Sequence, residues 1–275
     1  MKKAICILLT LVMALSLCTV AFAEAPADAA DEAYYSETNT KSGEDAATII
    51  EDEEVREAVL KRAEENDWEI LSVTTETVYV KDGYTKDGTY ENRPMTAAEV
   101  AAYKHATNLI APLAISNPRP LVKGKLTITL TAYTNARHEV ILSARADWGD
   151  VTIFSDQSKV PAAMNDTITI YWGGSGGLKA KGVSVLAYYS DGTKMPYDIA
   201  DQNNDSRYSW SFLEKKTTQV MDYMDITMTL GPGTTLKNTT TSATMQYTHT
   251  YYVNNGSTAI PNSWTISIQA SGLPY

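Results

Sequence analysis

Cysteine, histidine and basic charge are scarce in this sequence. Of its 275 residues, two are cysteine and three are histidine, and 33 acidic residues outnumber 23 basic ones. Both cysteines, Cys6 and Cys18, lie in the first 23 residues. A chain without that segment therefore has no disulfide, no thiolate nucleophile and no cysteine-ligated metal site. A nucleic-acid-binding surface needs a basic stripe, and the sequence contains none.

The first 23 residues have the pattern of a secretory signal peptide. Lys2 and Lys3 precede an apolar run over residues 4–20, and Ala21-Phe22-Ala23 puts small residues at positions −3 and −1 of a cleavage site. We expect cleavage after Ala23 and a protein that is secreted or associated with the cell wall, with no membrane span once the signal is removed. An uncleaved anchor is the alternative, because the run is nearly long enough to cross a membrane.

Acidic charge is concentrated directly after this segment. Residues 24–69 hold sixteen acidic and four basic side chains, whereas residues 70–275 hold seventeen of each. Residues 24–47 contain few apolar side chains and are predicted to form an acidic disordered spacer. Its charge would be repelled by anionic lipids and anionic wall polymers.

A small helix–strand–helix segment is predicted over residues 48–116. Thr48-x-x-Glu51 has the form of a capping box, and apolar residues follow it at helical spacing. A second box, Thr96-x-x-Glu99, opens another helix, and three prolines between residues 112 and 120 mark a boundary. The predicted elements are a helix over 49–66, a strand over 71–80 and a helix over 96–108.

A two-residue period of apolar and polar side chains runs through residues 117–275. In one stretch Leu126, Ile128 and Leu130 alternate with threonines, and about seven further stretches have the same pattern. Strands with one polar face each, and no convincing helix between them, predict antiparallel sheets that bury their apolar faces against each other. The predicted fold class is mainly β: an antiparallel β-sandwich preceded by a small α/β segment with two helices. A closed barrel is the alternative.

His249 is the first candidate functional residue. Tyr247, His249 and Tyr251 share one face of a predicted strand, and a histidine flanked by aromatic rings can hold a ligand or transfer a proton. The alternative is a structural histidine at the edge of the core, whose ring nitrogens form hydrogen bonds with neighbouring residues; its sequence pattern would be the same. Trp148 adjoins a predicted turn and is the tryptophan expected to be exposed. These four residues are the candidate ligand-binding set.

The loop Asp201-x-Asn203-x-Asp205 is the candidate metal site. Calcium binds alternate side-chain oxygens on a tight turn, and this loop supplies three. The turn glycine and the bidentate glutamate of an EF-hand loop are replaced by Ser206 and Phe212, so an ordinary polar turn is the alternative. Calcium is the one cofactor that the sequence suggests.

Threonines line the polar faces of the predicted strands. Thr127, Thr129 and Thr131 form one row, which β-propensity and solubility explain. A flat face rich in hydroxyl groups can also bind a polar polymer or another protein. No G-x-S-x-G or H-E-x-x-H motif accompanies the three histidines.

These observations favour a protein without catalytic activity. The leading hypothesis is a secreted or cell-wall-associated binding or interaction protein whose partner is a glycan or another surface protein. One alternative is a carbohydrate-binding module, because the 17 tyrosines and five tryptophans provide rings with polar tips. The other is a secreted hydrolase, which needs two carboxylates facing each other across a cleft.

Overall fold

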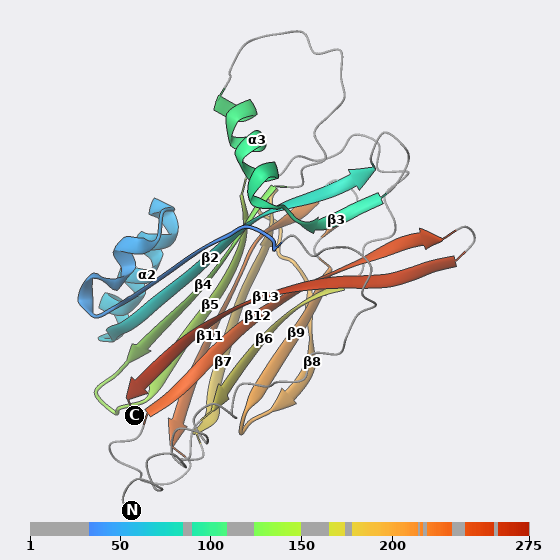
Figure 1. Cartoon of the computed structure of the whole chain (residues 1–275). Coiled ribbons are helices and arrows are strands. Elements are labelled where there is room, and N and C mark those ends of the chain that lie inside the picture. Colours follow the sequence, from blue (N-terminus) through green and yellow to red (C-terminus); the bar gives the residue numbers. More distant parts are fainter. Residues whose placement is uncertain are drawn as a thin grey trace, which may run out of the picture. The chain divides into compact units, whose positions relative to one another are not determined.

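The protein folds into two antiparallel β-sheets, which confirms the predicted sandwich. The computed structural model describes residues 33–84, 90–108, 124–149, 165–173, 178–213, 215–216, 219–232, 240–255 and 258–274. Tyr34–Tyr275 form one compact unit. Within it the strands of the two sheets lie in two layers, and the helices lie outside them (Figure 1).

The first sheet has eight strands, of which six follow one another in the order β1-β2-β4-β5-β11-β7. The short strand β3 pairs with β2, and β10 pairs with β11. Their bounds are β1 (Ser36–Ser42), β2 (Glu69–Tyr84), β3 (Tyr90–Pro94), β4 (Gly124–Thr134), β5 (Val140–Gly149), β7 (Leu178–Tyr189), β10 (Lys215–Lys216) and β11 (Gln219–Pro232).

The second sheet has five strands in the order β13-β12-β6-β9-β8. Their bounds are β6 (Asn165–Gly173), β8 (Tyr197–Asn203), β9 (Arg207–Leu213), β12 (Thr240–Asn255) and β13 (Thr258–Pro274). Strand β13 lies over β2 at one side of the sandwich, where the Thr74 hydroxyl donates a hydrogen bond to the Gln269 carbonyl (3.3 Å). The two sheets are thereby linked at that side.

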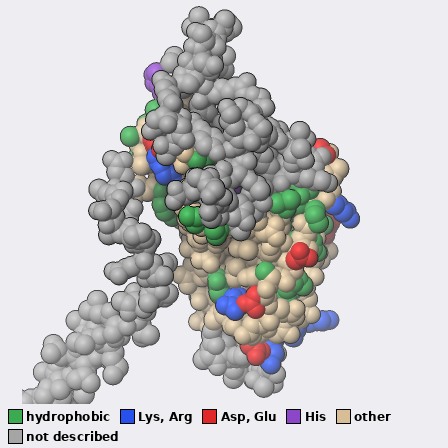
Figure 2. Space-filling view, turned by 90° about the vertical axis from the view of Figure 1, so that its right-hand side faces the viewer, with side chains coloured by type: hydrophobic (Ala, Val, Ile, Leu, Met, Phe, Trp, Pro, Cys, Tyr) green, Lys and Arg blue, Asp and Glu red, His purple; other side chains and the backbone are tan. Residues whose placement is uncertain are grey.

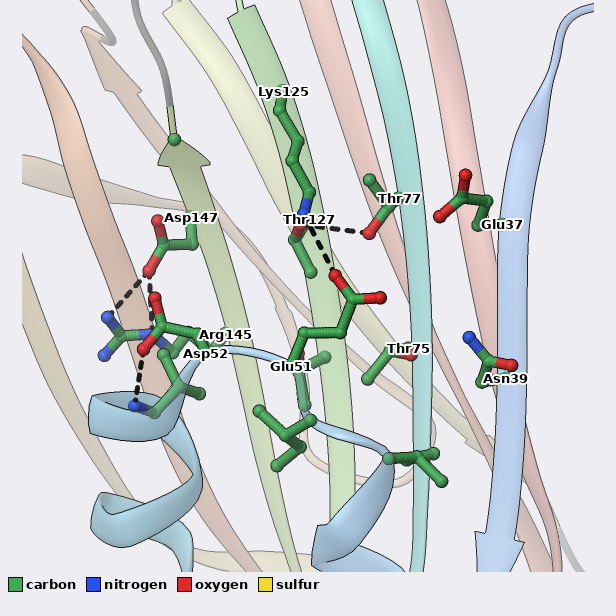
Figure 3. Close-up of a pocket in the computed structure, with 15 residues that line it drawn as sticks. Glu37, Asn39, Glu51, Asp52, Thr75, Thr77, Lys125, Thr127, Arg145 and Asp147 are labelled. Atoms are coloured by element: carbon green, nitrogen blue, oxygen red, sulfur yellow. Dashed lines mark hydrogen bonds and ion pairs between the residues drawn. The ribbon is translucent and has the colours of Figure 1, made fainter. Parts of the chain in front are cut away.

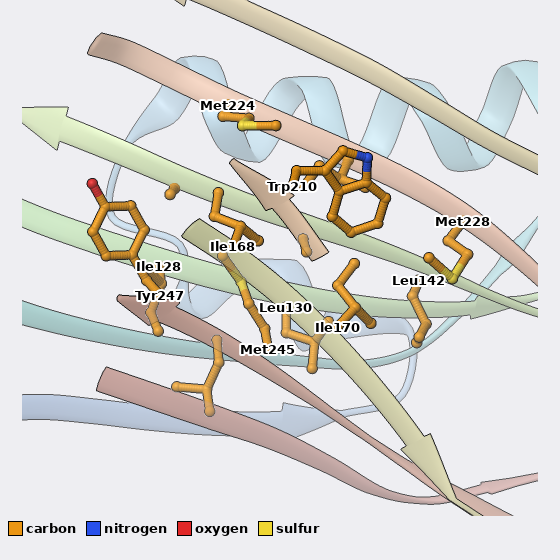
Figure 4. Packing of buried hydrophobic residues seen from close by; sticks show 14 of the residues in the cluster. Ile128, Leu130, Leu142, Ile168, Ile170, Trp210, Met224, Met228, Met245 and Tyr247 are labelled. Atoms are coloured by element: carbon orange, nitrogen blue, oxygen red, sulfur yellow. The ribbon is translucent and has the colours of Figure 1, made fainter. Parts of the chain in front are cut away.

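The hydrophobic core fills the space between the sheets, as the two-residue period predicts. Leu126, Ile128 and Leu130 of β4 are fully buried, while the threonines between them face outward. Methionines from β11 and large side chains from the second sheet pack against them (Figure 4). Burying one such side chain stabilises a fold by roughly 1.5–3 kcal/mol. The buried side chains labelled in Figure 4 are Ile128, Leu130, Leu142, Ile168, Ile170, Trp210, Met224, Met228, Met245 and Tyr247.

The described residues before β4 include the 3-10 helix η1 (Glu44–Ile49), α2 (Glu53–Asn66) and α3 (Ala97–Asn108). The capping box at residues 96–99 is confirmed, because the Glu99 carboxylate accepts a hydrogen bond from the Thr96 backbone N–H (2.9 Å). The box predicted at residues 48–51 is wrong. Thr48 belongs to η1, and α2 begins one turn later, where the Asp52 carboxylate caps the Val55 N–H (3.0 Å).

The predicted disordered spacer is wrong for the residues of it that the structure describes. Strand β1 pairs with β2 from Ser36↔Val78 to Ser42↔Ser72. It is an edge strand whose side chains are mostly exposed or half-buried, so it needs few apolar residues. Low apolar content therefore reflects its position rather than disorder. The predicted signal peptide and residues 24–32 lie outside the described residues.

The boundary predicted at residue 116 does not separate two units. Strand β2, which precedes it, pairs with β4, which follows it, from Glu69↔Thr134 to Val80↔Gly124. The apolar residues Val78 and Val80 of β2 belong to the same core as those of β4. The predicted helix–strand–helix segment is thus part of the sandwich, because its strand is a central member of the first sheet.

Glu76 is a carboxyl inside this core, and its removal is predicted to stabilise the protein. It lies on the inward face of β2, in a lateral row with Ile128 and Ala146, and is 5% exposed. Burial raises the pKa of Glu76, and a hydrogen bond from Ser36 opposes this only in part. A carboxyl with a raised pKa in the folded state destabilises the fold while it is ionised, and this cost disappears as pH falls through that pKa.

Glu76→Gln should therefore raise the Tm at pH 7.5, and the difference from the wild type should shrink at pH 5. A gain of ~1 kcal/mol corresponds to roughly 2–4 °C in a domain of this size. Thermal unfolding at both pH values measures it. Glu69→Gln, at an exposed position of the same strand, should leave the Tm unchanged at both. A lower Tm for Glu76→Gln at pH 7.5 would contradict the prediction.

Candidate functional site

A groove lies between the outer face of the first sheet and the η1–α2 segment (Figure 3). It has a volume of about 230 Å³. Strands β1, β2, β4 and β5 form its floor, and the chain from Ile49 to Val55 forms one wall. The groove therefore combines residues that lie more than 100 positions apart in the sequence.

The floor of the groove is built from two lateral rows of side chains that cross the strands. The first row begins at Glu37 of β1, and the second begins at Asn39 of the same strand. Because strand residues two apart share a face, both rows point outward, away from the core. The first row is Glu37, Thr77, Thr127 and Asp147; the second is Asn39, Thr75, Thr129 and Arg145.

Four threonines at the centre of these rows give the floor its hydroxyl groups. The Thr77 and Thr127 hydroxyls form a hydrogen bond with each other (3.0 Å). Thr75 and Thr129 are buried beneath the groove at 6% and 5% exposure. The row of threonines foreseen on β4 is thus one part of the site, and β2 supplies the other two. A hydroxyl both donates and accepts hydrogen bonds, so this floor suits a ligand with polar groups of either kind.

The wall is held in place by its own apolar residues. Ala46, Ala47 and Ile50 are buried in a cluster with Val55 and Val59 of α2 and with Val73 of β2. The Asp52 side chain caps the N-terminus of α2 and so fixes where this helix begins after η1. The apolar surface of Ile49, Ile50 and Val55 therefore faces the polar floor across the groove.

Most charged side chains in the groove have a charged partner within it or close to it, and the Asp52 carboxylate caps α2. Lys125 lies 3.3 Å from Glu51, and Arg145 lies 2.8 Å from Asp147. Glu37 is 2.7 Å from Lys104, and the Lys104 ammonium lowers the pKa of Glu37. Burial raises the pKa of Asp147, although the Arg145 charge opposes this. A charged ligand would have to displace one of these pairs, whereas an uncharged polar ligand would not.

A ridge of planar groups continues the first row beyond the groove. Asp147 is opposite Tyr223 of β11, and Tyr223 is opposite Tyr188 of β7. The Arg145 guanidinium lies over the Tyr223 ring at 3.9 Å from its centroid, and the two tyrosine rings are 5.5 Å apart. Both tyrosines are half-buried, so part of each ring lies at the surface. The sequence contains many tyrosines, but it does not indicate that these two lie beside the threonines, because that depends on the pairing of β5, β11 and β7.

The candidate residues around His249 lie inside the protein, apart from the half-buried Tyr251. His249 is 5% exposed, Tyr247 is fully buried, and Trp148 is 3% exposed. The expectation that Trp148 is exposed is therefore wrong: β5 continues through it to Gly149, and its indole N–H donates to the Tyr247 hydroxyl (3.2 Å). The Tyr251 ring stacks on His249 at 6.1 Å. The structure brings all four residues together, but around a buried carboxylate that the sequence reasoning did not single out.

That carboxylate is Asp166 of β6, which is fully buried. It accepts hydrogen bonds from the Tyr247 hydroxyl (2.5 Å), the His249 Nδ1 (3.0 Å) and the Thr250 backbone N–H (2.9 Å). On its other side His249 faces the Asn92 amide, with Nε2 3.0 Å from Nδ2. Both ring nitrogens of His249 therefore have protein partners.

The hydrogen bonds of Asn92 assign the proton on His249. The Trp264 indole N–H donates to Asn92 Oδ1 (2.8 Å), which turns the amide nitrogen toward the imidazole. Because an amide nitrogen only donates, His249 Nε2 accepts, and the proton lies on Nδ1 facing Asp166. His249 is thus a neutral histidine with both ring nitrogens hydrogen-bonded to its neighbours. This agrees with the structural role given as the alternative in the sequence analysis.

The candidate calcium loop crosses the turn between β8 and β9. Asp201 forms an ion pair with Arg207, Asp205 lies 3.1 Å from Lys179, and Asn203 Oδ1 accepts a hydrogen bond from the Asp205 N–H. Both carboxylates thus have cationic partners. No group of three or more histidine, cysteine, aspartate or glutamate side chains suited to a metal ion occurs among the described residues. Calcium binding here stays a prediction.

The face turned away from α2 has a different surface. In Figure 2 hydrophobic side chains appear there in several small areas that polar and charged atoms separate. Elsewhere in the second sheet, the exposed apolar residues of the described chain include Tyr197 and Ile199 on the edge strand β8. Within the described part of the chain, no helix is both long enough and apolar enough to cross a membrane.

Comparison with known proteins does not identify a family. The chain matches no protein-family model and no curated protein. Among solved structures it is similar to one described under "pH-induced modulation of Streptococcus parasanguinis adhesion by Fap1 fimbriae", with 15% sequence identity and a TM-score of 0.26. The match covers 54% of this chain and 82% of that one. A TM-score of this size supports no conclusion about a shared function.

Proposed function

We propose that this protein is an exported, non-catalytic binding protein that holds its ligand in the groove between the first sheet and the η1–α2 segment. The observation that carries the proposal is the groove itself, in which two rows of hydroxyl, amide and charged side chains face an apolar wall. Concave sites that combine apolar surface with a few converging polar groups are the usual form of ligand sites. The signal-like first 23 residues support export.

The chemistry of the lining favours binding over catalysis. The fifteen described residues that line the groove include no histidine, cysteine or serine. Asp147 is held by Arg145, and Asp52 is committed to capping α2, so neither is poised as a general base toward the groove. His249 is the histidine that the sequence suggested as a proton-transfer residue. Both of its ring nitrogens are hydrogen-bonded to protein groups inside the core. A hydrolase would need carboxylates free to exchange protons with a substrate.

A screen with small polar probes tests this proposal. Backbone amide NMR spectra of the protein should be recorded with millimolar glucose, N-acetylglucosamine, amino acids or short peptides. We expect one class of probe to shift the amide signals of Thr77, Thr127 and Gly149. Thr127→Tyr, which fills the floor of the groove, should abolish the shifts, and Asp147→Asn should weaken them at least ~10-fold in affinity, the loss of about one charge-assisted hydrogen bond.

The matched control is Thr167→Tyr on the outer face of the second sheet, which should leave the shifts intact. Thermal unfolding of each variant establishes that it folds. The proposal fails if no class of probe shifts the groove amides, or if shifts persist unchanged in folded Thr127→Tyr and Asp147→Asn.

A further inference from the structure

The first lateral row does not end at the groove, and its course indicates the kind of ligand. Strand register carries it from Glu37 through Thr77, Thr127 and Asp147 to Tyr223 and Tyr188, across six strands. We propose, resting on the function proposed above, that the ligand is a neutral saccharide chain of at least two units lying along this row, across the strands. One unit occupies the groove and the next packs on the ridge formed by Tyr223 and Tyr188.

The composition of the row matches the surfaces of a sugar. The groove end offers hydroxyls and the Asp147 carboxylate, which can bond to sugar hydroxyls. The ridge end offers two half-buried tyrosine rings. Because Arg145 covers one face of the Tyr223 ring, the apolar C–H face of a pyranose would pack on the remaining exposed ring surface of Tyr223 and Tyr188, whose hydroxyls can donate hydrogen bonds. An amphipathic ligand with both kinds of surface therefore satisfies the whole row, whereas an aliphatic ligand would leave the groove floor unmatched.

The charge of the site selects a neutral ligand. The two cations of the groove each have an acidic partner within it, Glu51 for Lys125 and Asp147 for Arg145. Lys104 neutralises Glu37 at the far end of the row. An anionic or cationic polymer would gain contacts with one member of each pair only by weakening its contact with the other. A neutral chain gains hydrogen bonds without that loss.

The dimensions require a chain rather than a single ring. A groove of about 230 Å³ is smaller than the ~300–1,000 Å³ of sites for drug-sized ligands, so it holds a small unit. Neighbouring strands lie ~4.8 Å apart, and the row continues over two further strands beyond the groove. A chain that crosses the strands thus reaches from the groove floor, which ends at β5, to the tyrosines of β11 and β7.

The stacked arginine keeps this ridge rigid. The Arg145 guanidinium is bound to Asp147 on one side and lies over the Tyr223 ring on the other. The groove and the ridge therefore share one fixed side chain. A ridge that is ordered before the ligand arrives loses less conformational entropy on binding.

Calorimetry with glucose and N-acetylglucosamine oligomers of one to six units tests the proposal. We expect affinity to rise at least tenfold from the single sugar to the trimer and then to level off. Tyr223→Ala should reduce the trimer's affinity at least tenfold, and Tyr223→Phe, which keeps the ring, should restore most of it. Tyr197→Ala, an exposed tyrosine of β8 in the other sheet, should leave the affinities unchanged.

Each remaining outcome has a separate meaning. If amino acids or peptides shift the groove amides but no oligosaccharide binds, the saccharide proposal is overturned and the binding function stands. If oligosaccharides bind with an affinity independent of length, the extended placement along the row is overturned. If they bind equally well to folded Tyr223→Ala and to folded Thr127→Tyr, the sugar site lies elsewhere, and both proposals fail.

Discussion

Asp166→Ala is expected to lower the free energy of unfolding by about 3–5 kcal/mol, the summed cost of three lost hydrogen bonds and one of the two largest effects that the structure predicts. The Asp166 carboxylate is fully buried and accepts hydrogen bonds from Tyr247, His249 and the Thr250 N–H. Alanine removes the acceptor of all three hydrogen bonds, and a buried donor that loses its acceptor costs about 1–3 kcal/mol. In a domain of this size the loss corresponds to roughly 2–4 °C of Tm for each kcal/mol.

Two further variants separate this explanation from a general effect of mutating a strand. Asp166→Asn keeps an oxygen acceptor but turns an amide N–H₂ toward some of the same donors, so it should lose less stability than alanine. Asp198→Ala, at an exposed aspartate of β8, should change stability by less than ~0.5 kcal/mol. Urea unfolding gives all three values. A loss below ~1 kcal/mol for Asp166→Ala would show that the buried donors find other partners.

The sequence pattern indicates that Asp166 and His249 are buried, but it does not show that they lie next to each other. Asp166 and His249 stand in phase with apolar residues of their strands, Asp166 with Ile168 and His249 with Met245 and Tyr247. A polar residue in phase with a buried face must find a hydrogen-bond partner inside the fold. The pairing of β6 with β12, which brings the two together, depends on contacts between residues 69 to 83 positions apart. Periodicity within single strands does not specify such pairings.

Local patterns predicted the strands well where one face is buried and the other exposed. The alternation of Leu126, Ile128 and Leu130 with threonines placed β4 correctly and assigned its faces. The same reasoning failed for β1, because an edge strand with few buried side chains has no apolar face to recognise. It failed for Trp148 because a glycine after a strand residue resembles a turn, although β5 extends through both.

The candidate site could be predicted only in part, for a similar reason. The threonines of β4 were recognisable as a row with two interpretations, solubility or binding. Thr75 and Thr77 carry the same signal in β2, but their alignment with β4 is a matter of register. The wall of the groove comes from η1 and α2, whose position over the sheet depends on buried contacts between Ile50, Val59 and Val73. Tertiary packing therefore converts an ordinary polar strand face into a groove.

The second large effect is expected at Arg62, which ties α2 to the first sheet. Its guanidinium donates to both carboxylate oxygens of Asp225 (2.8 and 3.3 Å) and to the Ser143 hydroxyl (2.5 Å). The side chains of Arg62 and Asp225 are 19% and 7% exposed. Arg62→Met leaves the Asp225 charge buried without its cation, which should cost about 3–5 kcal/mol. Urea unfolding measures the loss.

The double variant Arg62→Met/Asp225→Leu distinguishes a buried charge from lost packing. Replacing both members of a buried ion pair by apolar side chains of similar size is often neutral or stabilising, so the double variant should recover most of the stability that Arg62→Met loses. Lys61→Met removes an exposed neighbouring cation, paired with Glu65 at 3.7 Å, and should change stability by less than ~0.5 kcal/mol. If the double variant is as unstable as the sum of the single ones, Arg62 stabilises the fold through packing of its side chain. If instead stability returns, the wall of the groove should still form, and binding of a groove probe by the double variant would show that the site does not depend on the ion pair.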